Sequence, residues 1–580
     1  MSKQPRDPPK VNIPPLSKRS PGCPLRPTQS SHETDVLGEQ IQGSLVKASK
    51  EDYPGYLKTG PQSTRKESFF DLDFKVISIE TGVVGSKDDI SPGSEPPGTV
   101  LLETTLNNTT RHPTPSSDPN DPLNWKPWRK ALNFFLVLFF TVVAFSCNCV
   151  ATAFWGQLNT ELGFSFDELN NGFALGIGGL GIGCPLFVPI AVKFGKRPVY
   201  LVATILVIVA TFWQARMKYL HDYYAASFLE GLATSLCEAM IQMTIADLYF
   251  VHQRGTMNGI FMIIIAISNF LSLVPAGYIA TNINWNTCFW ILGGLGSGFL
   301  IVSVFCFEET KFERAEDDPR DIHELHPPQG KMKWQLRPYT ITTGSWGDFF
   351  KTFYTPFVVL ISFPIVLFVT LHYTFMLTWL AMCATTLANS FTQPPYEFSP
   401  EAIGNMNIAP FIGLLIGSFY GGWLNDKSML YLTKRNHGVY EPEMRLYMLI
   451  PMCLIMTAGV FMFGLSIATG THWAVPMVGL GVFAAGFGAN GSITLTYLID
   501  CYRDMISDAF IGIVVVRNIM SMVVTFCLSP WIDLNGLRNV FIIAGCLSLV
   551  PLVVTPFMIK YGKHLRRLSA DKYNKNKGGI

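Results

Sequence analysis

The sequence predicts an all-α membrane protein with twelve transmembrane helices in two six-helix bundles, preceded by a disordered cytosolic N-terminal tail. Hydrophobic residues make up 49% of the 580 residues, whereas charged residues make up only 15%. The apolar residues gather into about twelve runs, each close to the roughly 20 residues that cross a hydrocarbon core of about 30 Å. A polar stretch near 311–351 separates the runs into two sets of six, and each set carries a basic loop after its second run.

These runs divide the chain into five parts. We expect a cytosolic, mostly disordered tail over 1–127, a first six-helix bundle over 128–310, a central cytosolic loop over 311–351, a second bundle over 352–560 and a basic cytosolic tail over 561–580. The first tail is rich in Pro, Ser, Asp and Lys, a composition that buries too little apolar surface to offset the entropy of ordering. The predicted spans are Ala131–Phe154, Asn171–Val192, Val199–Phe212, Tyr223–Tyr249, Met257–Ala280, Thr287–Phe307, Tyr354–Cys383, Ile403–Leu424, Leu446–Ile467, Trp473–Leu498, Ile506–Trp531 and Val540–Ile559.

The distribution of Lys and Arg predicts how the chain is oriented in the membrane. If the N-terminal tail is cytosolic, the cytosolic loops hold most of the basic residues, among them Lys196 and Arg197. The opposite loops hold only Arg216, Lys218 and Arg538. Because basic residues concentrate in cytosolic loops, both termini are expected in the cytosol. We therefore expect a multi-pass protein of the plasma membrane.

The two predicted bundles echo each other in sequence. The loop after the second span reads Lys193-Phe-Gly-Lys-Arg-Pro198, and its counterpart in the second half reads Gly421-Gly-Trp-Leu-Asn-Asp426-Lys, followed by Thr433-Lys-Arg435. A parallel repeat of this kind places a substrate near the membrane midplane, between two bundles that rock against each other. The expected partners are a small-molecule substrate, protons and the lipid bilayer, and the chain is expected to act as a monomer. Nucleic acid is not expected, since the formal net charge is only +2.

Four motifs stand at predicted span boundaries: Asn120-Asp-Pro-Leu-Asn-Trp125, Asp247-Leu-Tyr-Phe-Val-His-Gln-Arg254-Gly, Phe307-Glu-Glu-Thr310 and Arg435-Asn-His-Gly-Val-Tyr-Glu-Pro-Glu-Met-Arg445-Leu. Together they resemble the major facilitator superfamily, in particular its fungal twelve-span, drug:proton antiporter-like branch. The resemblance covers roughly Asp118 to the C-terminus. It implies the major facilitator fold and secondary transport, but it does not identify the substrate, because one fold hosts many functions.

The chain departs from the family pattern at two places in the first half. The family usually has an Asp three residues before the glycine that matches Gly195, and this position is Val192. The resemblance therefore implies that the first half lacks the usual carboxylate latch, whereas the second half keeps it as Asp426. The antiporter pattern Gly-Pro-x-x-Gly-Gly of the fifth span is reduced to Pro275 and Gly277.

Three ionisable residues lie deep within predicted spans, where a charged side chain costs at least about 2.5–3.5 kcal/mol. Glu230 and Glu238 share the fourth span, and Arg517 lies in the eleventh, at a depth between the two glutamates if each residue rises about 1.5 Å. We expect one glutamate, Glu238 before Glu230, to bind and release the coupling proton. Burial favours its neutral form, and a nearby Arg517 favours its ionised form. The alternative is a static ion pair that fixes helix packing.

Five further polar or aromatic side chains in the spans are candidates for lining a substrate cavity. They are Asn148, His372, Trp379, Asn490 and Asn518. For each, the alternative is a hydrogen bond between helices, which is worth only about 0.6 kcal/mol on average.

A third group of residues is expected to form an inner gate and to permit its movement. It consists of Gly195, Lys196, Arg197, Asp247, Arg254, Pro275, Gly277, Asp426 and Arg435. Lys196 and Arg197 are suited to holding helix C-termini and carboxylates, and Asp247 with Arg254 is suited to forming a latch. The alternative for the basic residues is that their charges only set the topology.

These features predict secondary active transport of small organic compounds by alternating access. Proton-coupled export of amphiphilic or cationic substrates, such as drugs, toxins, metabolites or polyamines, fits the two glutamates, although Arg517 fits an anion equally well. Proton-coupled uptake is one alternative, and a non-transporting membrane sensor with the carrier fold is another. The sequence shows no nucleotide-binding, metal-binding or catalytic motif, so we expect no cofactor, no bound metal and no enzymatic activity.

Overall fold

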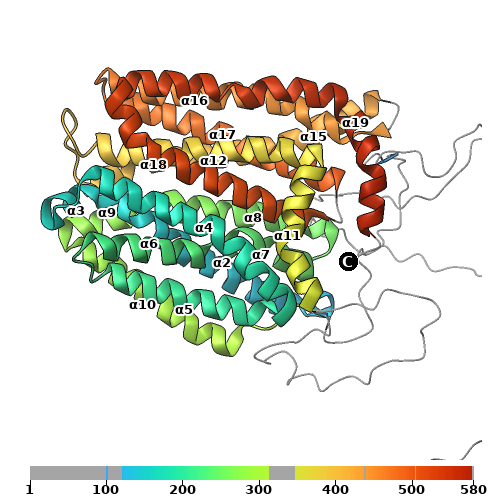
Figure 1. The fold of residues 1–580 in the computed structure, drawn as a ribbon, viewed down its shortest axis with the longest axis horizontal. Helices are drawn as coiled ribbons and strands as arrows, with labels where there is room; N and C mark the ends of the chain where they lie inside the picture. The colour runs from blue at the N-terminus through green and yellow to red at the C-terminus, as the bar shows by residue number, and fades with distance from the viewer. Residues whose placement is uncertain (1–99, 102–120, 312–345, 437–438, 503–504, 578–580) are drawn as a thin grey trace, which may run out of the picture. The chain divides into compact units, whose positions relative to one another are not determined.

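The computed structural model describes residues 100–101, 121–311, 346–436, 439–502 and 505–577, and Figure 1 shows how they fold. Most of the tail predicted to be disordered over 1–127, and most of the central loop predicted over 311–351, fall outside these residues, whereas 100–101 and 121–127 of the predicted tail are described and form β1, η1 and the start of α2. Helices account for nearly all of the described chain. An all-helical fold is therefore confirmed.

The helices of the first half begin after the short strand β1 (Val100–Leu101). In chain order they are η1 (Pro122–Asn124), α2 (Pro127–Val150), η2 (Ala151–Phe154), α3 (Trp155–Leu162), α4 (Phe166–Phe194), α5 (Lys196–Gln214), α6 (Leu220–Thr234), α7 (Leu236–Leu248), α8 (Val251–Ala266), the π-helix η3 (Ile267–Leu271), α9 (Leu273–Asn282) and α10 (Trp285–Cys306).

The second half has a matching series of long helices. In chain order its elements are α11 (Trp346–Ser362), α12 (Pro364–Ser390), α13 (Pro400–Met406), α14 (Ile408–Phe419), the π-helix η4 (Tyr420–Leu424), α15 (Asn425–Arg435), β2 (Val439–Tyr440), η5 (Pro442–Met448), α16 (Leu449–Ala468), α17 (Ala474–Cys501), α18 (Ile506–Leu547) and α19 (Val550–Lys577). Strand β2 pairs with β1 in an antiparallel register that places Tyr440 opposite Val100.

Within the described residues, ten helical segments are long and apolar enough to cross a membrane. The last of them covers 63 residues, Asp508–Ala570, and its backbone turns at Gly536, where φ is 76° and ψ is 149°. Helices α6 and α7 are each shorter than these segments and are separated at Ser235. Most predicted spans therefore correspond to an observed apolar helix.

Several helix boundaries differ from the prediction. The seventh span, predicted over Tyr354–Cys383, is divided because α11 ends at Ser362 and Pro364 starts a new helix. Proline has no N–H to donate to the preceding turn and is favoured at the first position of a helix. Helix α11 also begins at Trp346, inside the predicted loop, and α19 continues to Lys577, through most of the predicted basic tail.

The helices of each half pack mainly against one another, and Figure 1 shows the two sets side by side. Between the halves, the most extensive contacts join α4 to α18 and α9 to α13. Inside the second half, Gly413 and Gly417 lie one turn apart on α14 and face the carbonyl oxygens of Gly481 and Ala485 on α17. Small residues let two helix backbones approach closely, which favours packing where lipid surrounds the helices.

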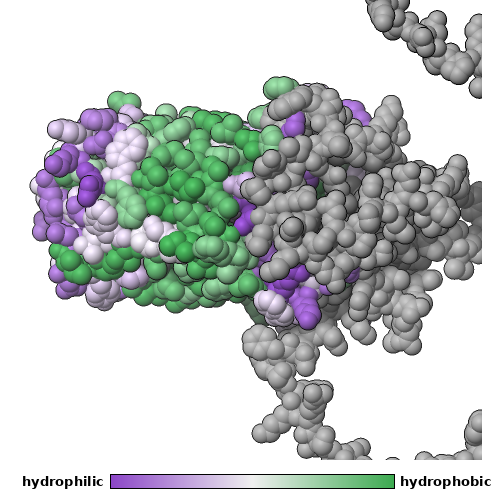
Figure 2. Space-filling model, turned by 90° about the horizontal axis from the view of Figure 1, so that it is seen from below, coloured by the Kyte–Doolittle hydropathy of each residue, from purple (hydrophilic) through white to green (hydrophobic). Residues whose placement is uncertain are grey.

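The outer surface of the bundle is apolar along its middle. Figure 2 shows hydrophobic residues over this region and hydrophilic residues gathered at the end that carries α3 and α9. Large apolar side chains such as Phe305, Ile361 and Val553 are largely exposed on the helices. A protein in water rarely exposes so large an apolar patch, whereas a multi-pass membrane protein presents one to the lipid.

The close approach of α14 and α17 can be tested with one added methyl group. In Gly417→Ala the new Cβ would lie 2.0 Å from the oxygen of Ala485, so the two helices must separate. We expect the purified protein to lose about 1–3 kcal/mol of stability, measured by thermal or denaturant unfolding. The control is Gly298→Ala in α10, where the added Cβ meets no atom within 4 Å and stability should stay the same or rise slightly. Equal losses in both variants would contradict the packing argument.

Candidate functional site

An ion pair between α7 and α18 joins the two halves deep inside the bundle. The Arg517 guanidinium donates through Nη2 to Oε1 of Glu238, and Asn518 Nδ2 donates to Oε2 of the same carboxylate at 3.0 Å. The Glu238 and Arg517 side chains are only 9% and 12% exposed. The guanidinium carbon also lies 5.8 Å from the ring centre of Tyr373 on α12. The predicted proximity of Arg517 to one of the two glutamates is therefore found for Glu238.

The depth of this pair follows from the helix ends. Glu238 precedes the end of α7 at Leu248 by ten residues, and Arg517 follows the start of α18 at Ile506 by eleven. At 1.5 Å per residue both side chains lie about 15–17 Å from that end of the bundle, which is about half of a 30 Å hydrocarbon core. Helix α18 reaches this position because Gly181 of α4 leaves room for it; a Cβ there would lie 3.2 Å from the Cβ of Asn518.

The other predicted glutamate has different partners. Glu230 on α6 is buried within the first half, where Gln214 Nε2 of α5 donates to its Oε2 at 2.7 Å. The thiol of Cys147 on α2 also contacts the carboxyl group. Glu230 and Glu238 lie eight residues apart, about 12 Å along the helix axis, so the two glutamates reach different partners.

Asn148 and Trp379 keep unused hydrogen-bonding capacity. Asn148 Nδ2 and Trp379 Nε1 are buried, and neither nitrogen has a hydrogen-bond partner among the described residues. Asn518 uses its amide nitrogen on Glu238, while its Oδ1 has no partner in the same part of the chain. Buried polar atoms are normally paired, so these three atoms stand out as hydrogen-bonding groups without a use in the described part of the chain.

His372 and Asn490 instead contact neighbouring helices of the second half. His372 Nε2 lies 3.3 Å from the Thr555 hydroxyl of α19, and the ring packs edge-on against Phe368. The Cys453 thiol of α16 donates to Asn490 Oδ1 at 3.4 Å. These contacts match the alternative role of joining helices, and they place both residues within one half.

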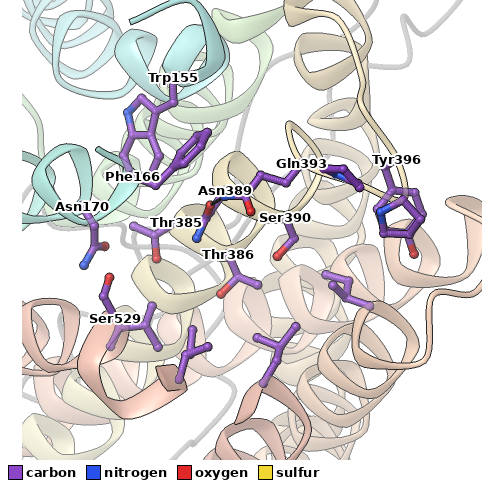
Figure 3. A pocket seen from close by; sticks show the side chains of 16 residues that line it. Trp155, Phe166, Asn170, Thr385, Thr386, Asn389, Ser390, Gln393, Tyr396 and Ser529 are labelled. Carbon is purple, nitrogen blue, oxygen red and sulfur yellow. Dashed lines mark hydrogen bonds between the residues drawn. The ribbon is translucent and has the colours of Figure 1, made fainter. Parts of the chain in front are cut away.

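A cavity of about 250 Å³ lies elsewhere, between α3 and α4 of the first half and α12 and α18 of the second (Figure 3). Its lining includes Asn170, Thr386 and Ser529, but none of the five residues predicted to line a cavity. Ser529 follows Asn518 by eleven residues on α18, so the cavity is about 16 Å farther along the bundle than the ion pair. Sequence reasoning missed it, because its lining residues are all uncharged and none belongs to a quoted motif.

Charged residues gather at the opposite end of the bundle, called here the basic face, which carries Lys196 of the first half and Arg445 of the second. At Gly195, where φ is 104°, α4 ends and α5 begins. The backbone N–H groups of Lys196 and Arg197 donate to the two oxygens of Glu309, each at 3.0 Å. A carboxylate is favoured there because a helix N-terminus carries unpaired N–H groups and the positive end of the helix dipole.

This arrangement corrects the expectation that the first half lacks a carboxylate latch. Val192 supplies no carboxylate, but Glu309 reaches the start of α5 from the segment after α10. Lys311 of the same segment donates to the Val192 carbonyl at 2.5 Å. Glu309 belongs to the motif Phe307-Glu-Glu-Thr310, so its carboxylate is visible in the sequence. The motif does not indicate which helix this carboxylate contacts.

Both halves repeat one charge pair at the basic face. Lys196, the first residue of α5, pairs with Asp247 near the end of α7. Arg445, just before α16, pairs with Asp500 near the end of α17 at 2.7 Å. The predicted partner of Asp247 was Arg254, whose side chain is outside the described residues.

Arg445 also connects further polar groups of the second half. It pairs with Asp426 at 2.6 Å, and its Nε donates to the hydroxyl of Tyr440 at 3.1 Å. The Tyr440 hydroxyl donates to Asp500. Burial and the Asp500 carboxylate hold the pKa of Tyr440 well above its usual value, so this hydroxyl stays protonated. Arg435, also predicted for the gate, is exposed in the last turn of α15.

Pro275 and Gly277 lie on α9, at the interface with the other half. A Cβ on Gly277 would lie 2.4 Å from the carbonyl oxygen of Pro400 at the start of α13. Pro275 has no N–H for the carbonyl of Leu271, and the π-helix η3 ends at that residue. The irregular helix and the close contact therefore occur together where the halves meet.

One fully buried ion pair at the basic face was not predicted. Arg566 of α19 is 0% exposed and binds Glu443 of η5 through two hydrogen bonds of 2.9 and 2.7 Å. Glu443 belongs to the motif that ends at Arg445, but its partner lay in a segment expected to be a tail. A linear motif cannot identify a partner 123 residues away.

Comparisons with known proteins agree with this architecture. The sequence profile of the Major Facilitator Superfamily matches residues 134–505. An uncharacterized MFS-type transporter of Schizosaccharomyces pombe is 30% identical over 80% of this chain and 88% of its own length. Protein HOL1 of Saccharomyces cerevisiae is 28% identical over 78% and 89%, and efflux pump radE of Floropilus chiversii is 24% identical over 77% and 83%.

A solved structure extends the comparison to the fold. The MFS proton:xylose symporter XylE, known from E. coli, bound to 6-bromo-6-deoxy-D-glucose, aligns with a TM-score of 0.53 and 16% identity. The alignment covers 75% of this chain and 96% of that one. At this identity the likeness concerns the fold alone.

Two cations on α19 provide a matched test of the basic face. Arg566→Met leaves Glu443 buried without its partner, so we expect a loss of about 3–5 kcal/mol in stability. Lys563 lies nearly one turn away, is 43% exposed and pairs with Glu441, so Lys563→Met should cost about 1 kcal/mol or less. Unfolding of both purified variants measures the difference. Similar losses would show that burial does not set the strength of these pairs.

Proposed function

This chain belongs to the major facilitator superfamily, and on that premise we propose that it is a proton-coupled transporter that exports amphiphilic or cationic organic compounds. The family consists of multi-pass membrane transporters of small molecules, and the chain is not an enzyme. The observation that carries the proposal is the Arg517–Glu238 pair, because it joins one half to the other about midway through the membrane.

Because of this pair, the free energy needed to separate the two halves depends on the charge of Glu238. If α18 moves away from α7, Glu238 loses both the guanidinium of Arg517 and the amide of Asn518. An unpaired buried charge costs about 3–5 kcal/mol, so the separated state needs a substitute partner for the carboxylate. A proton supplies one by neutralising Glu238, and a cationic substrate supplies another by taking the place of Arg517.

Proton and substrate then compete for one carboxylate. A cation that binds Glu238 requires the ionised form, so its arrival releases the proton to the side then open. Release of the cation to the other side leaves a carboxylate that either takes a proton or pairs again with Arg517. Alternation between these partners exchanges substrate for protons, and no cofactor or nucleotide is needed.

The remaining elements fit alternating access in a membrane. Counting α6 with α7 as one crossing, and dividing Asp508–Ala570 at Gly536, gives twelve crossings in two sets of six. We assign the basic face to the cytosol, because cytosolic loops carry the excess of Lys and Arg. Its ion pairs hold the helices of each half together, so the inner gate would open and close by movement of whole halves, and the contact of α9 with α13 would form the outer gate. Both termini are then cytosolic, in a monomer of the plasma membrane.

Export is supported by the name of one relative, the efflux pump radE, and by the fit of a carboxylate to cations. The experiment reconstitutes the full chain in liposomes and imposes a pH gradient of either sign. The probes are labelled spermidine and tetraphenylphosphonium as cations and labelled benzoate as an anion. Cation flux opposite in direction to the proton flux supports exchange. Cation flux in the same direction as the proton flux indicates uptake. If the pH gradient drives no flux of any probe, the result favours a sensor.

Glu238 and Glu230 can be separated by parallel substitutions. In Glu238→Gln the side chain keeps its size but cannot exchange a proton, so we expect gradient-driven cation flux to fall at least about 100-fold while unfolding shows a folded protein. Glu230→Gln keeps a hydrogen-bonding group for Gln214 and should retain flux within about 3-fold. The opposite pattern, loss in Glu230→Gln and retention in Glu238→Gln, would move the coupling site to Glu230.

A further inference from the structure

We propose that the 250 Å³ cavity between α3, α4, α12 and α18 is a binding site for an uncharged small molecule that combines a ring or apolar face with hydroxyl or carboxamide groups. It is distinct from the charged pair assigned to transport. Its walls, two buried polar atoms without partners among the described residues and its position across both halves support this assignment.

The walls combine aromatic surface with polar groups. Trp155 and Phe166 supply aromatic rings from the first half, and Figure 3 shows them on one side of the cavity. On the other side the side chains of Thr385, Thr386 and Asn389 follow one another along α12. Sites that bind small molecules combine apolar and aromatic surface with convergent polar groups, and this lining has both kinds, with polar side chains making up about half of it.

Two of these polar groups are buried without a partner. The hydroxyl of Thr386 and Oδ1 of Asn170 have no hydrogen-bond partner among the described residues, and both side chains are about 3% exposed. In Figure 3 the polar ends of Asn170, Thr385 and Ser529 point toward one region of the cavity. A buried polar atom without a partner costs about 1–3 kcal/mol, which a ligand that supplies the missing donor or acceptor would recover.

The cavity is also free of charge. Of the sixteen described residues that line it, none is Asp, Glu, Lys, Arg or His. An ion that enters would lose its water without gaining an opposite charge, which is unfavourable. A neutral molecule meets hydroxyl and amide groups that can donate and accept, so the site selects against the cations that Glu238 is suited to bind.

The cavity lies between the two halves, so a bound ligand would affect how the halves are arranged. Asn170 Nδ2 of α4 donates to the Thr525 carbonyl of α18 at 2.7 Å, so the cavity lies where the two halves already touch. A ligand held by α3 and α4 on one side and by α12 and α18 on the other binds best to the arrangement in which both walls are present. It would therefore stabilise that arrangement relative to one in which the halves have separated.

The test uses three probes of the same size that differ in charge: benzamide, benzoate and benzylammonium. Equilibrium dialysis of labelled probe against the full-length protein in nanodiscs, with empty nanodiscs as the blank, should show saturable binding of benzamide only. Thr386→Val removes the unpartnered hydroxyl and should weaken benzamide binding about 10-fold. Thr370→Val is the matched control on α12, because the Thr370 hydroxyl donates to the Val366 carbonyl away from the cavity, and affinity should stay within about 2-fold.

A second variant tests whether the absence of charge in the wall excludes cations. Asn389→Asp keeps the oxygen that accepts from Gln393 and adds one negative charge to the wall, so benzylammonium, which should not bind the unaltered protein, should now show saturable binding. Glu238→Gln should keep benzamide binding even if it loses transport, which separates this proposal from the proposed function. The proposal is overturned if benzamide shows no saturable binding, if a charged probe binds the unaltered protein as tightly, or if both cavity substitutions leave the three affinities unchanged.

Discussion

The cost of an unpaired charge in a medium without water governs this structure more than any other constraint. Each ionisable group at depth has a specific partner: Glu238 has Arg517 and Asn518, and Glu230 has Gln214. The same rule holds at the basic face for Arg566 and its two hydrogen bonds to Glu443. Because losing a partner is costly, these pairs hold particular helices together and restrict which helices can move apart.

The pairs fall into two classes with different mechanical consequences. Those at the basic face mostly join helices of one half, as Lys196 with Asp247 and Arg445 with Asp500 do, and so keep each bundle rigid. The pair at depth joins α7 to α18 and therefore opposes the movement of one bundle against the other. A carrier needs both, rigid bundles and an interface whose stability responds to a bound proton or substrate.

Packing allows the polar groups to reach one another. Glycines on α4 and α14 let α18 and α17 approach so closely that side chains from distant parts of the chain share one environment. The contact of Gly277 with Pro400 does the same for α9 and α13. Substituting such a glycine moves a whole helix, and with it any charge pair that the helix carries. Helix packing and electrostatics are therefore not independent in this protein.

The sequence by itself determined the all-helical membrane class, the two-fold repeat and the three charged residues at depth, because apolar runs, loop charges and motifs are local properties. Only the tertiary structure decided that Arg517 meets Glu238 rather than Glu230, since Arg517 and Glu238 lie 279 positions apart and the two glutamates are about 12 Å apart along their helix. It also decided that Glu309 replaces the carboxylate missing at Val192, and that His372 and Asn490 contact helices of one half. The uncharged cavity had no sequence signal, because its walls are ordinary residues that become a site only when four helices meet.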